Sequence, residues 1–210
     1  MIRAFVVDDH PLVRRGVINL LNEEPGLKVV GEAGNAAEAL ERIPDAVPHV
    51  LLLDISMPGR NGLDLLKDVK TRFPDVPVLV LSMHNEDRFA VRALRAGASG
   101  YVTKSAPAEE LIGAIRRVSE GKAYVSPSLA DLLVHDLDAD ASRLPHERLS
   151  DREYQVLCMI AQGKRVREIA AELALSVHTI GTFRARVLKK LKLKTNMDLT
   201  RYALTNRLID

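Results

Sequence analysis

The sequence predicts an α/β domain built on a five-stranded, doubly wound parallel sheet, followed by a small domain made only of helices. Three observations support this division. Short apolar runs alternate with segments of helical periodicity through residues 4–120. From residue 150 onward the chain shows helical patterns and no strand candidate. The length of 210 residues also suits two small domains.

The first domain is predicted from five runs that are almost entirely apolar. Such runs indicate strands buried on both faces, as in parallel sheets covered by helices. The expected strands are residues 4–7, 27–33, 50–55, 76–82 and 100–103. The expected helices are residues 12–22, 36–43, 62–73, 86–96 and 107–120. In sheets of this kind the chemistry lies beyond the carboxyl ends of the strands.

Charge is distributed unevenly along the chain. Residues 1–125 carry 16 basic and 17 acidic residues, residues 126–149 carry 2 and 5, and residues 150–210 carry 12 and 6. The net charge of +2 therefore hides an acidic middle and a basic end. The basic end is suited to a polyanion such as nucleic acid.

The acidic middle is also rich in turn residues, which indicates a linker. A short helical piece is expected within it at 128–135. The predicted domains are therefore 1–122 and 149–210, joined by a linker at 123–148.

The second domain is predicted as four helices. Ser150 and Glu153 are spaced as a capping box at the start of the first one. A short turn at 175–176 joins the second helix to the third, which is the arrangement of a helix-turn-helix. The expected helices are residues 151–162, 167–174, 177–192 and 197–204.

Polar side chains follow four of the five predicted strands. Asp8 and Asp9 follow the first, Asp54 ends the third, Ser82 ends the fourth and Lys104 follows the fifth. Each alone is most simply a solvated acid or a loop lysine. Together at one edge of a sheet, carboxylates suit a hard cation such as Mg²⁺, and the hydroxyl and lysine suit a phosphoryl group. A carboxylate there can itself accept the phosphoryl group.

Other kinds of site fit the sequence poorly. The stretch GEAGNAAEAL has the wrong glycine spacing for dinucleotide binding and follows the second strand. A hydrolase working through an aspartyl phosphate would carry an acid two residues after Asp54, where Ser56 stands. Cys158 is the sole cysteine and lies among apolar residues, so it is expected to be an inert core thiol.

Nothing in the sequence predicts membrane insertion or export. No apolar run approaches the roughly 20 residues that span a bilayer. The run at 4–7 is too short for a signal peptide and acids follow it directly. We therefore expect a protein of the reducing cytoplasm with no membrane partner.

The predicted third helix of the second domain has two distinct faces. One is apolar and carries Ile180, Phe183, Val187 and Leu191. The opposite face is small or basic and carries His178, Thr182, Ala185 and Lys189. From composition alone, this second face is either a solvated basic surface or the face that enters a DNA major groove.

Four stretches of the first domain, VVDDH, LLLDISMPGRNG, VLVLSMH and GASGYVTKSA, resemble the receiver domain of two-component response regulators. The resemblance covers about residues 1–122 and implies a flavodoxin-like fold. It implies that Asp54 is the phosphoacceptor. It also implies that Asp9, Asp54 and the Ser56 carbonyl bind Mg²⁺, while Asp8 acts through a bound water.

The same resemblance assigns roles to the later strand ends. Ser82 would hydrogen-bond the phosphoryl group and Lys104 would pair with it. Tyr101 stands where the family keeps an aromatic that swings inward on phosphorylation, although it also suits an edge strand. His84 is either a neighbour of the phosphoryl group or a surface residue. Many receivers have proline after the lysine, and Ser105 stands there instead, which leaves the geometry of that bond open.

The second domain, from LSDREYQVLCMIAQGKRVREIAAELALSVHTI to VLKKLKL, resembles the LuxR-type DNA-binding domain. A receiver followed by such a domain resembles the NarL/FixJ class of response regulators. Within that class, GKRVREIA and MDLTRYAL look most like the GacA/UvrY branch, which controls small regulatory RNAs. The family often has Val-Lys-x-His after the threonine, whereas this chain has Ile180, Gly181, Thr182 and Phe183. The operator therefore cannot be carried over from better-known relatives.

The resemblance places two sets of residues at the DNA. The residues expected near base edges are His178, Gly181, Thr182 and Ala185. The residues expected at phosphates are Lys164, Arg165, Thr179, Arg186, Lys189 and Lys190. Arg184 lies near the apolar face and is expected either to brace the fold or to contact an edge phosphate.

Together the two resemblances imply a transcription factor switched by phosphorylation. A histidine kinase would phosphorylate Asp54, and the phosphorylated chain would form a homodimer on an inverted repeat in double-stranded DNA. The protein would not be an enzyme, apart from slow loss of its own phosphoryl group. The rival hypothesis is a receiver whose output is protein contact, with the tail as a dimerisation module.

Overall fold

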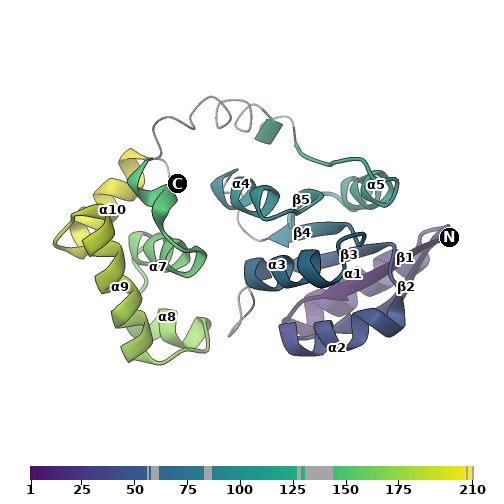
Figure 1. Cartoon of the computed structure of the whole chain (residues 1–210), viewed down its shortest axis with the longest axis horizontal. Coiled ribbons are helices and arrows are strands. Elements are labelled where there is room, and N and C mark those ends of the chain that lie inside the picture. The colour runs from purple at the N-terminus through teal and green to yellow at the C-terminus, as the bar shows by residue number, and fades with distance from the viewer. Residues whose placement is uncertain are drawn as a thin grey trace. The chain divides into compact units, whose positions relative to one another are not determined.

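The structure of the chain, a computed structural model, forms two compact units, Met1–Leu133 and Val134–Asp210 (Figure 1). It describes residues 1–55, 57, 62–82, 87–126, 129–130, 144–206 and 208–209. The expected helix at 128–135 and part of the expected linker lie largely outside the described residues.

Unit 1 contains the predicted five-stranded parallel sheet, with strand order β2-β1-β3-β4-β5. All four strand pairs are parallel. The strands are β1 (Ile2–Val7), β2 (Leu27–Ala33), β3 (Val50–Asp54), β4 (Val78–Ser82) and β5 (Gly100–Thr103). The fourth strand begins two residues later than predicted because Pro77 has no N–H to donate to a strand pair.

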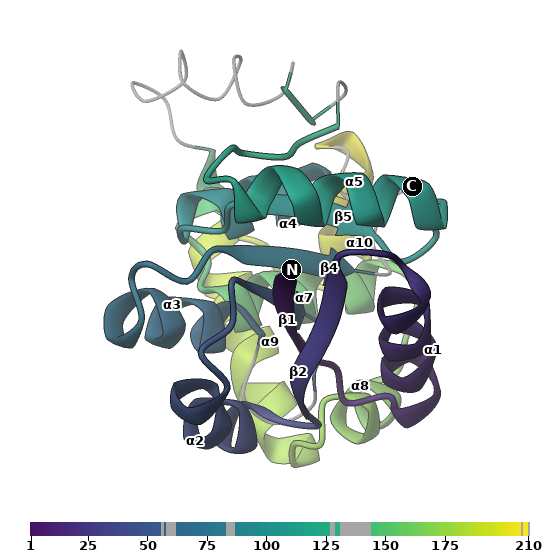
Figure 2. The same cartoon turned by 90° about the vertical axis from the view of Figure 1, so that its right-hand side faces the viewer.

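Helices α1 to α5 cover the sheet on its two faces (Figure 2). They are α1 (Pro11–Glu23), α2 (Ala36–Ala46), α3 (Gly62–Arg72), α4 (Asp87–Arg95) and α5 (Ala108–Ser119). Successive side chains of each strand point to opposite faces of the sheet, and each face has its own hydrophobic core. Phe5 and Val7 belong to a core with residues of α2, α3 and α4, while Ala4 and Val6 belong to a core with α1 and α5.

Helix α2 runs three residues past its predicted end at residue 43, with Pro44 inside it. A proline this close to the carboxyl end removes a single helical hydrogen bond, so the last turn survives. The helix ends where Val47 adopts a left-handed conformation and donates its backbone N–H to the Ile43 carbonyl.

The chain returns along the free edge of β5 after α5. The Tyr124 carbonyl accepts the Tyr101 N–H at 3.2 Å, and the Tyr124 N–H donates to the Ser99 carbonyl at 3.0 Å. The Tyr124 hydroxyl donates to Glu110 on α5 at 3.0 Å. A little further on, Leu129 is 2% exposed and joins the core that contains Tyr101. The first part of the stretch 123–148 is therefore packed onto unit 1.

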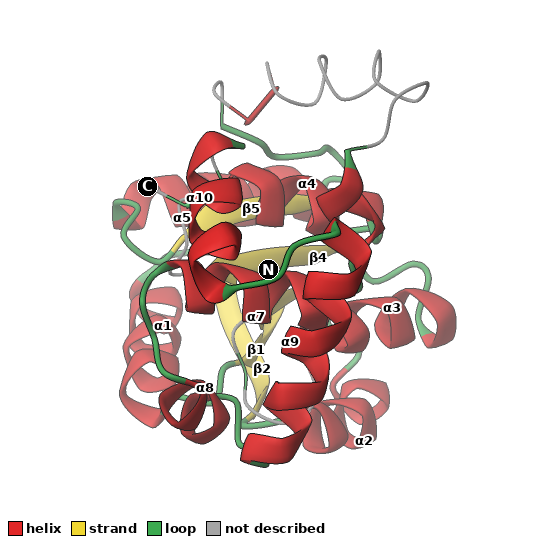
Figure 3. Cartoon of the chain, turned by 90° about the vertical axis from the view of Figure 1, so that its left-hand side faces the viewer, coloured by secondary structure: helices red, strands yellow, loops and turns green. Residues whose placement is uncertain are grey.

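Unit 2 is all-helical, as predicted (Figure 3). A short 3-10 helix, η1 (Pro145–Arg148), precedes α7 (Asp151–Ala161), α8 (Val166–Glu172), α9 (Val177–Leu191) and α10 (Asn196–Thr205). Helix α8 ends two residues before its predicted end, and Ala174 beyond it has a φ of 50°. The turn between α8 and α9 follows.

Two capping motifs set the starts of helices in unit 2. The Ser150 hydroxyl accepts the Glu153 N–H, and the Glu153 carboxylate accepts the Ser150 N–H at 2.8 Å, which confirms the predicted capping box. Ser176 caps α9 by accepting the Thr179 N–H at 3.0 Å. Upstream, the buried His146 contacts the Tyr202 hydroxyl at 3.0 Å, so the end of the stretch 123–148 is packed onto unit 2.

Candidate functional site

The carboxyl ends of β1 and β3 bring two carboxylates together. The two strands are direct neighbours, with Val7 in register with Leu53, so Asp8 and Asp54 stand side by side. Asp8 is 1% exposed and Asp54 is 0% exposed. Burial of two carboxylates is costly unless positive charge neutralises them.

Lys104 supplies a positive charge between the two carboxylates. Its Nζ donates to Asp8 Oδ2 and to Asp54 Oδ2, both at 2.7 Å. Burial alone would lower the pKa of Lys104, but the charges and hydrogen bonds of Asp54 and Asp8 outweigh it, and the pKa is raised. The backbone N–H of Lys104 donates to the Ser82 carbonyl at 2.7 Å, which anchors the lysine to the end of β4.

Asp9 and His10 extend this group on its outer side. One potential ligand atom from each of Asp8, Asp9, His10 and Asp54 lies within 4.8 Å of every other. One carboxylate oxygen of Asp9 is buried without a hydrogen-bond partner among the described residues, although His10 Nδ1 lies 3.2 Å from it. A buried carboxylate oxygen that lacks a donor fits a cation, so the cluster is able to bind a metal ion.

The loop carrying these acids is held from α1 by a residue that sequence reasoning missed. Arg14 donates from Nη1 to the Asp8 carbonyl and from Nε to Glu32 on β2, both at 2.7 Å. The His10 N–H donates to Asp8 Oδ1 at 2.8 Å. In the sequence Arg14 could not be distinguished from its neighbour Arg15, and its position in the first helix after the Asp pair did not mark it for a role.

The remaining predicted residues of unit 1 lie at the same sheet edge, within β5, or outside the described residues. Ser82 is 0% exposed at the end of β4, beside the end of β3. Tyr101 is 6% exposed and packs into the core shared with Leu129. Ser56 and His84 lie outside the described residues. No cis peptide bond occurs in the described part of the chain, so the bond between Lys104 and Ser105 is trans.

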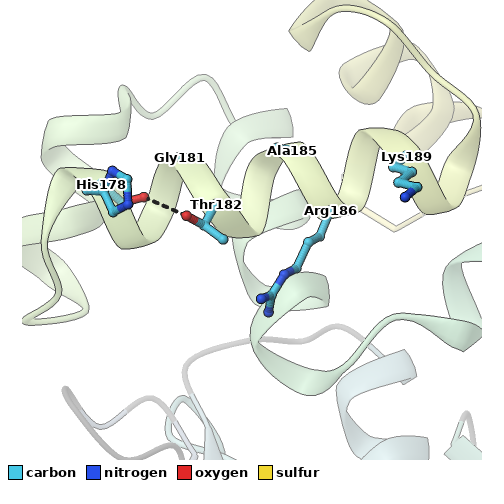
Figure 4. Close-up of a pocket in the computed structure, with 6 residues that line it drawn as sticks. All are labelled: His178, Gly181, Thr182, Ala185, Arg186 and Lys189. Atoms are coloured by element: carbon cyan, nitrogen blue, oxygen red, sulfur yellow. Dashed lines mark hydrogen bonds between the residues drawn. The ribbon is translucent and has the colours of Figure 1, made fainter.

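Helix α9 carries a surface hollow on the face opposite its buried side. The hollow is lined by His178, Gly181, Thr182, Ala185, Arg186 and Lys189 (Figure 4). All four residues predicted near base edges therefore line one hollow with two predicted phosphate residues. On the other side of the helix Ile180, Val187 and Leu191 are buried, as the apolar pattern predicted, while Phe183 of the same pattern is half-buried.

Two residues of this hollow have a local geometry that matters for recognition. A Cβ built on Gly181 meets no atom within 4 Å. The Thr182 hydroxyl donates back to the His178 carbonyl at 3.1 Å (Figure 4). The hydroxyl is thereby occupied within the helix.

The other predicted phosphate residues are partly engaged within unit 2. Lys190 donates to Glu153 and Lys164 donates to Glu172. Thr179 contacts the Ser176 hydroxyl at 2.8 Å at the amino end of α9. The Arg165 side chain is exposed at the start of α8.

Two residues outside the hollow are held inside the unit. Arg184 donates to the Asn196 side chain at the start of α10, which fits the bracing role among the two that were expected. Cys158 is 3% exposed, as expected for a core thiol.

Within the described residues, no helix is long and apolar enough to cross a membrane.

Comparison with known families accounts for both units. Residues 4–116 match the response regulator receiver domain, and residues 147–203 match bacterial regulatory proteins of the luxR family. The first match covers the five strands and the second covers the helices α7 to α9.

Known relatives match along the whole chain. Response regulator GacA of Pseudomonas protegens is 39% identical, covering 100% of this chain and 99% of the relative. Response regulator UvrY of Escherichia coli is 34% identical, covering 99% and 96%. The structure of RcsB from Salmonella enterica serovar Typhimurium, bound to promoter rprA in the presence of phosphomimetic BeF3-, is 28% identical with a TM-score of 0.65, covering 96% and 97%.

Proposed function

The chain belongs to the two-component response regulators that join a receiver domain to a LuxR-type DNA-binding domain, and from this premise we propose that phosphorylation of Asp54 controls DNA binding by helix α9. A histidine kinase is the proposed donor of the phosphoryl group. The observation that carries the proposal is the Lys104 ammonium held between Asp8 and Asp54, each at 2.7 Å. A phosphoryl group on Asp54 would add negative charge beside Lys104 and so change the balance between this lysine and the two carboxylates.

The proposed chemistry is transfer of a phosphoryl group to a carboxylate. An oxygen of Asp54 forms the new O–P bond while the P–N bond to the histidine of the kinase breaks, and its electron pair returns to the imidazole nitrogen. Lys104 then exchanges the Asp54 carboxylate for an oxygen of the phosphoryl group. The transfer needs little from the protein beyond position and charge neutralisation, and the buried carboxylates and lysine supply both.

We propose Mg²⁺ as the cation of this site. Asp9, Asp54 and the Ser56 carbonyl would hold it, with Asp8 acting through a water. The all-oxygen ligand set supports a hard cation, as does the buried Asp9 oxygen that accepts no hydrogen bond from a described residue. When bound, Mg²⁺ neutralises the charge that gathers on the phosphoryl oxygens.

The proposed switch runs from Ser82 to Tyr101. Ser82 ends β4 and would hydrogen-bond the phosphoryl group, drawing the end of that strand inward. Tyr101 lies on the adjacent strand, in the core that also contains Leu129, and its N–H donates to the Tyr124 carbonyl of the returning segment at 3.2 Å. A change in the Tyr101 position therefore acts directly on the segment that leads towards unit 2.

The proposed output is a dimer on double-stranded DNA with an inverted repeat. Met197 and Leu204 on α10 are 81% and 52% exposed, and their spacing of seven residues puts them on one face. That face is the proposed contact between two copies. The RcsB structure, which contains promoter DNA in the presence of a phosphomimetic, supports DNA as the partner and phosphorylation as the signal.

Two further properties complete the proposal. The protein is not an enzyme in purpose, and slow hydrolysis of its own aspartyl phosphate would act as a timer. It works in the cytoplasm, where a kinase and DNA are both accessible. The rival output is protein contact by the receiver, with unit 2 as a dimerisation module, and the salt dependence of duplex binding distinguishes the two.

The direct test is intact-mass measurement after incubation with a small-molecule phosphodonor and Mg²⁺. The wild type is expected to gain one phosphoryl group, and Asp54→Asn is expected to gain none. Asp75→Asn, which changes an exposed acid of the same unit, serves as the matched control and should gain the group normally. Omission of Mg²⁺ should prevent the gain in every variant.

The output is tested on the two states of the same samples. Fluorescence anisotropy with labelled duplexes should show tighter binding by the phosphorylated wild type and a steep loss of affinity with salt. Binding that is insensitive to salt and to Asp54 would contradict DNA as the target and favour the protein-contact output.

A further inference from the structure

Gly181 has no structural reason to be a glycine. It stands inside α9, where glycine is the poorest helix former apart from proline. Its φ lies outside the left-handed region, and a Cβ built on it meets nothing within 4 Å. By contrast, Gly62 is crowded by the Asp54 and Ile55 backbone, and Gly163 has a φ of +87°. The fold therefore requires those glycines and does not require Gly181.

The space above Gly181 belongs to the hollow described above. Ala185, one turn further along, contributes a methyl group to the same hollow. Thr182 contributes its methyl group as well, because its hydroxyl is turned back to the His178 carbonyl (Figure 4). The centre of this face is thus apolar, although cationic Arg186 and Lys189 line the same hollow.

The occupant of such a surface follows from the chemistry of base edges. In the major groove, the donors and acceptors of all four bases are polar, and the single apolar group is the 5-methyl of thymine. Flanking cations are suited to phosphates. We propose that Gly181 is a specificity residue, and that a thymine methyl of the operator packs into the space a Cβ at this position would fill. This inference rests on the proposed function, since it concerns the DNA face of the same helix.

The proposal predicts a reversal of preference. For the wild type, thymine at the contacted position should bind better than uracil, which differs by that methyl alone, by roughly fourfold, the effect of burying one methyl group. In Gly181→Ala the new methyl collides with that of thymine and fills the space left by uracil. The variant should therefore bind the thymine duplex roughly tenfold more weakly than the wild type does, and bind the uracil duplex at least as well as the thymine duplex.

The experiment uses the full chain, phosphorylated, and duplexes selected from a randomised pool. Each thymine of the selected duplex is replaced singly by deoxyuridine, and dissociation constants are measured by fluorescence anisotropy for both variants. Gly16→Ala is the matched control, because Gly16 is also inside a helix with no atom within 4 Å of a built Cβ, but lies in unit 1. It should keep the wild-type preference at every position.

Folding is monitored on the same samples. Gly181→Ala should melt a few degrees higher than the wild type, about 4 °C for a domain of this size, because alanine is the better helix former. A loss of thymine preference in a more stable protein is then a loss of recognition.

The outcomes separate the inference from the function beneath it. Equal penalties for Gly181→Ala on thymine and uracil duplexes, or a wild type indifferent to every thymine, would overturn the role of Gly181 while leaving DNA binding intact. If selection yields no duplex with salt-sensitive binding, the proposed function fails and the inference fails with it.

Discussion

The sheet edge of unit 1 and the outer face of α9 in unit 2 handle charge in opposite ways. At the sheet edge, Asp8 and Asp54 are buried and Lys104 is bonded to both. On α9, Arg186 and Lys189 are exposed, and no ion pair joins either side chain to another described residue. At the sheet edge a buried lysine offsets part of the negative charge, whereas the cations of α9 are left for a partner outside the chain.

The difference decides what a substitution can do. A change inside the sheet edge leaves a buried charge without its partner, so folding and function are altered together. A change on the face of α9 removes a charge that no fold contact uses, so binding is altered alone. Substitutions in the two regions should therefore separate effects on folding from effects on binding.

The largest effect is expected from Lys104→Met. Methionine keeps much of the volume but leaves Asp8 and Asp54 facing each other, so the free energy of unfolding should fall by about 3–5 kcal/mol, as for a broken buried pair. The raised pKa of Lys104 keeps its charge, and thus this stability, present at neutral pH; the stability is lost as pH rises through that pKa. Urea denaturation at neutral pH measures the loss.

Two comparisons accompany this variant. Mg²⁺ should restore part of the lost stability, because a cation again lies between the carboxylates. Lys122→Met is the control, since Lys122 pairs with Glu120 where both side chains are more than half exposed, and it should change the stability little. A stability loss of similar size in both variants would remove the distinction between buried and exposed charge.

The next effect is expected from Gly100→Ala. A Cβ at Gly100 would lie 2.8 Å from the Tyr124 carbonyl and 2.9 Å from Leu79 Cδ1, so the returning segment must shift, at about 1–3 kcal/mol. Gly113→Ala in α5, where a Cβ meets nothing within 4 Å, should be neutral or stabilising. Thermal denaturation of the two variants, measured side by side, distinguishes crowding from helix propensity.

The sequence predicted the sheet edge well because the rule that governs it is simple. Apolar runs mark parallel strands, and the residues that follow them meet at one edge. The sequence alone therefore predicted that Asp8, Asp54 and Ser82 lie at one edge of the sheet. The apolar pattern of α9 likewise fixed which face is buried and which is outside.

The sequence could not predict contacts that leave no periodic pattern of apolar and polar residues. The pairing of Tyr124 with the edge of β5 is made by backbone atoms and leaves no side-chain pattern. The pair between Lys190 and Glu153 joins helices 37 residues apart, so Lys190 resembled any other basic residue of the outer face. Arg14 donates to the backbone carbonyl of Asp8, and because every residue has such a carbonyl, the residue type at position 8 does not reveal the contact. Such contacts become visible when the chain is folded.

Neighbouring lysines of α9 allow the contrast to be tested within one helix. Lys190 is paired with Glu153, whose side chain is 4% exposed, whereas Lys189 faces the hollow. Lys190→Met should lower the free energy of unfolding by about 1 kcal/mol, a modest figure because Lys190 is itself 42% exposed. Lys189→Met should leave stability unchanged and reduce the salt slope of DNA binding by about one unit. If both variants changed stability and the salt slope of DNA binding alike, the proposed difference between Lys190 and Lys189 would be wrong.

The pH dependence of Lys190→Met has a definite sign. Burial alone would raise the pKa of Glu153. The hydrogen bonds from Lys190 and Ser150 and the charge of Lys190 lower it by more than burial raises it, so the pKa is below its usual range. A lowered pKa gives stability that is present above the unfolded value, about 4.3, and is lost as pH falls through the folded value. Without Lys190 the pKa rises, so acid unfolding should begin at a higher pH than in the wild type.

The smallest effect is expected from Tyr124→Phe, which removes the hydroxyl that donates to Glu110 at 3.0 Å and leaves the ring in place. The free energy of unfolding should fall by about 0.5 kcal/mol, as for a single partly exposed hydrogen bond.

Burial, the hydrogen bond to Glu110 and the charge of Glu110 raise the pKa of Tyr124, in that order of size. The contribution of the hydroxyl is therefore present below the unfolded pKa, about 10, and is lost as pH rises through the folded value. The difference between wild type and variant should shrink in alkaline urea denaturation. Equal stability of wild type and variant at every pH would mean that the ring alone, and not the hydroxyl, holds the returning segment to α5.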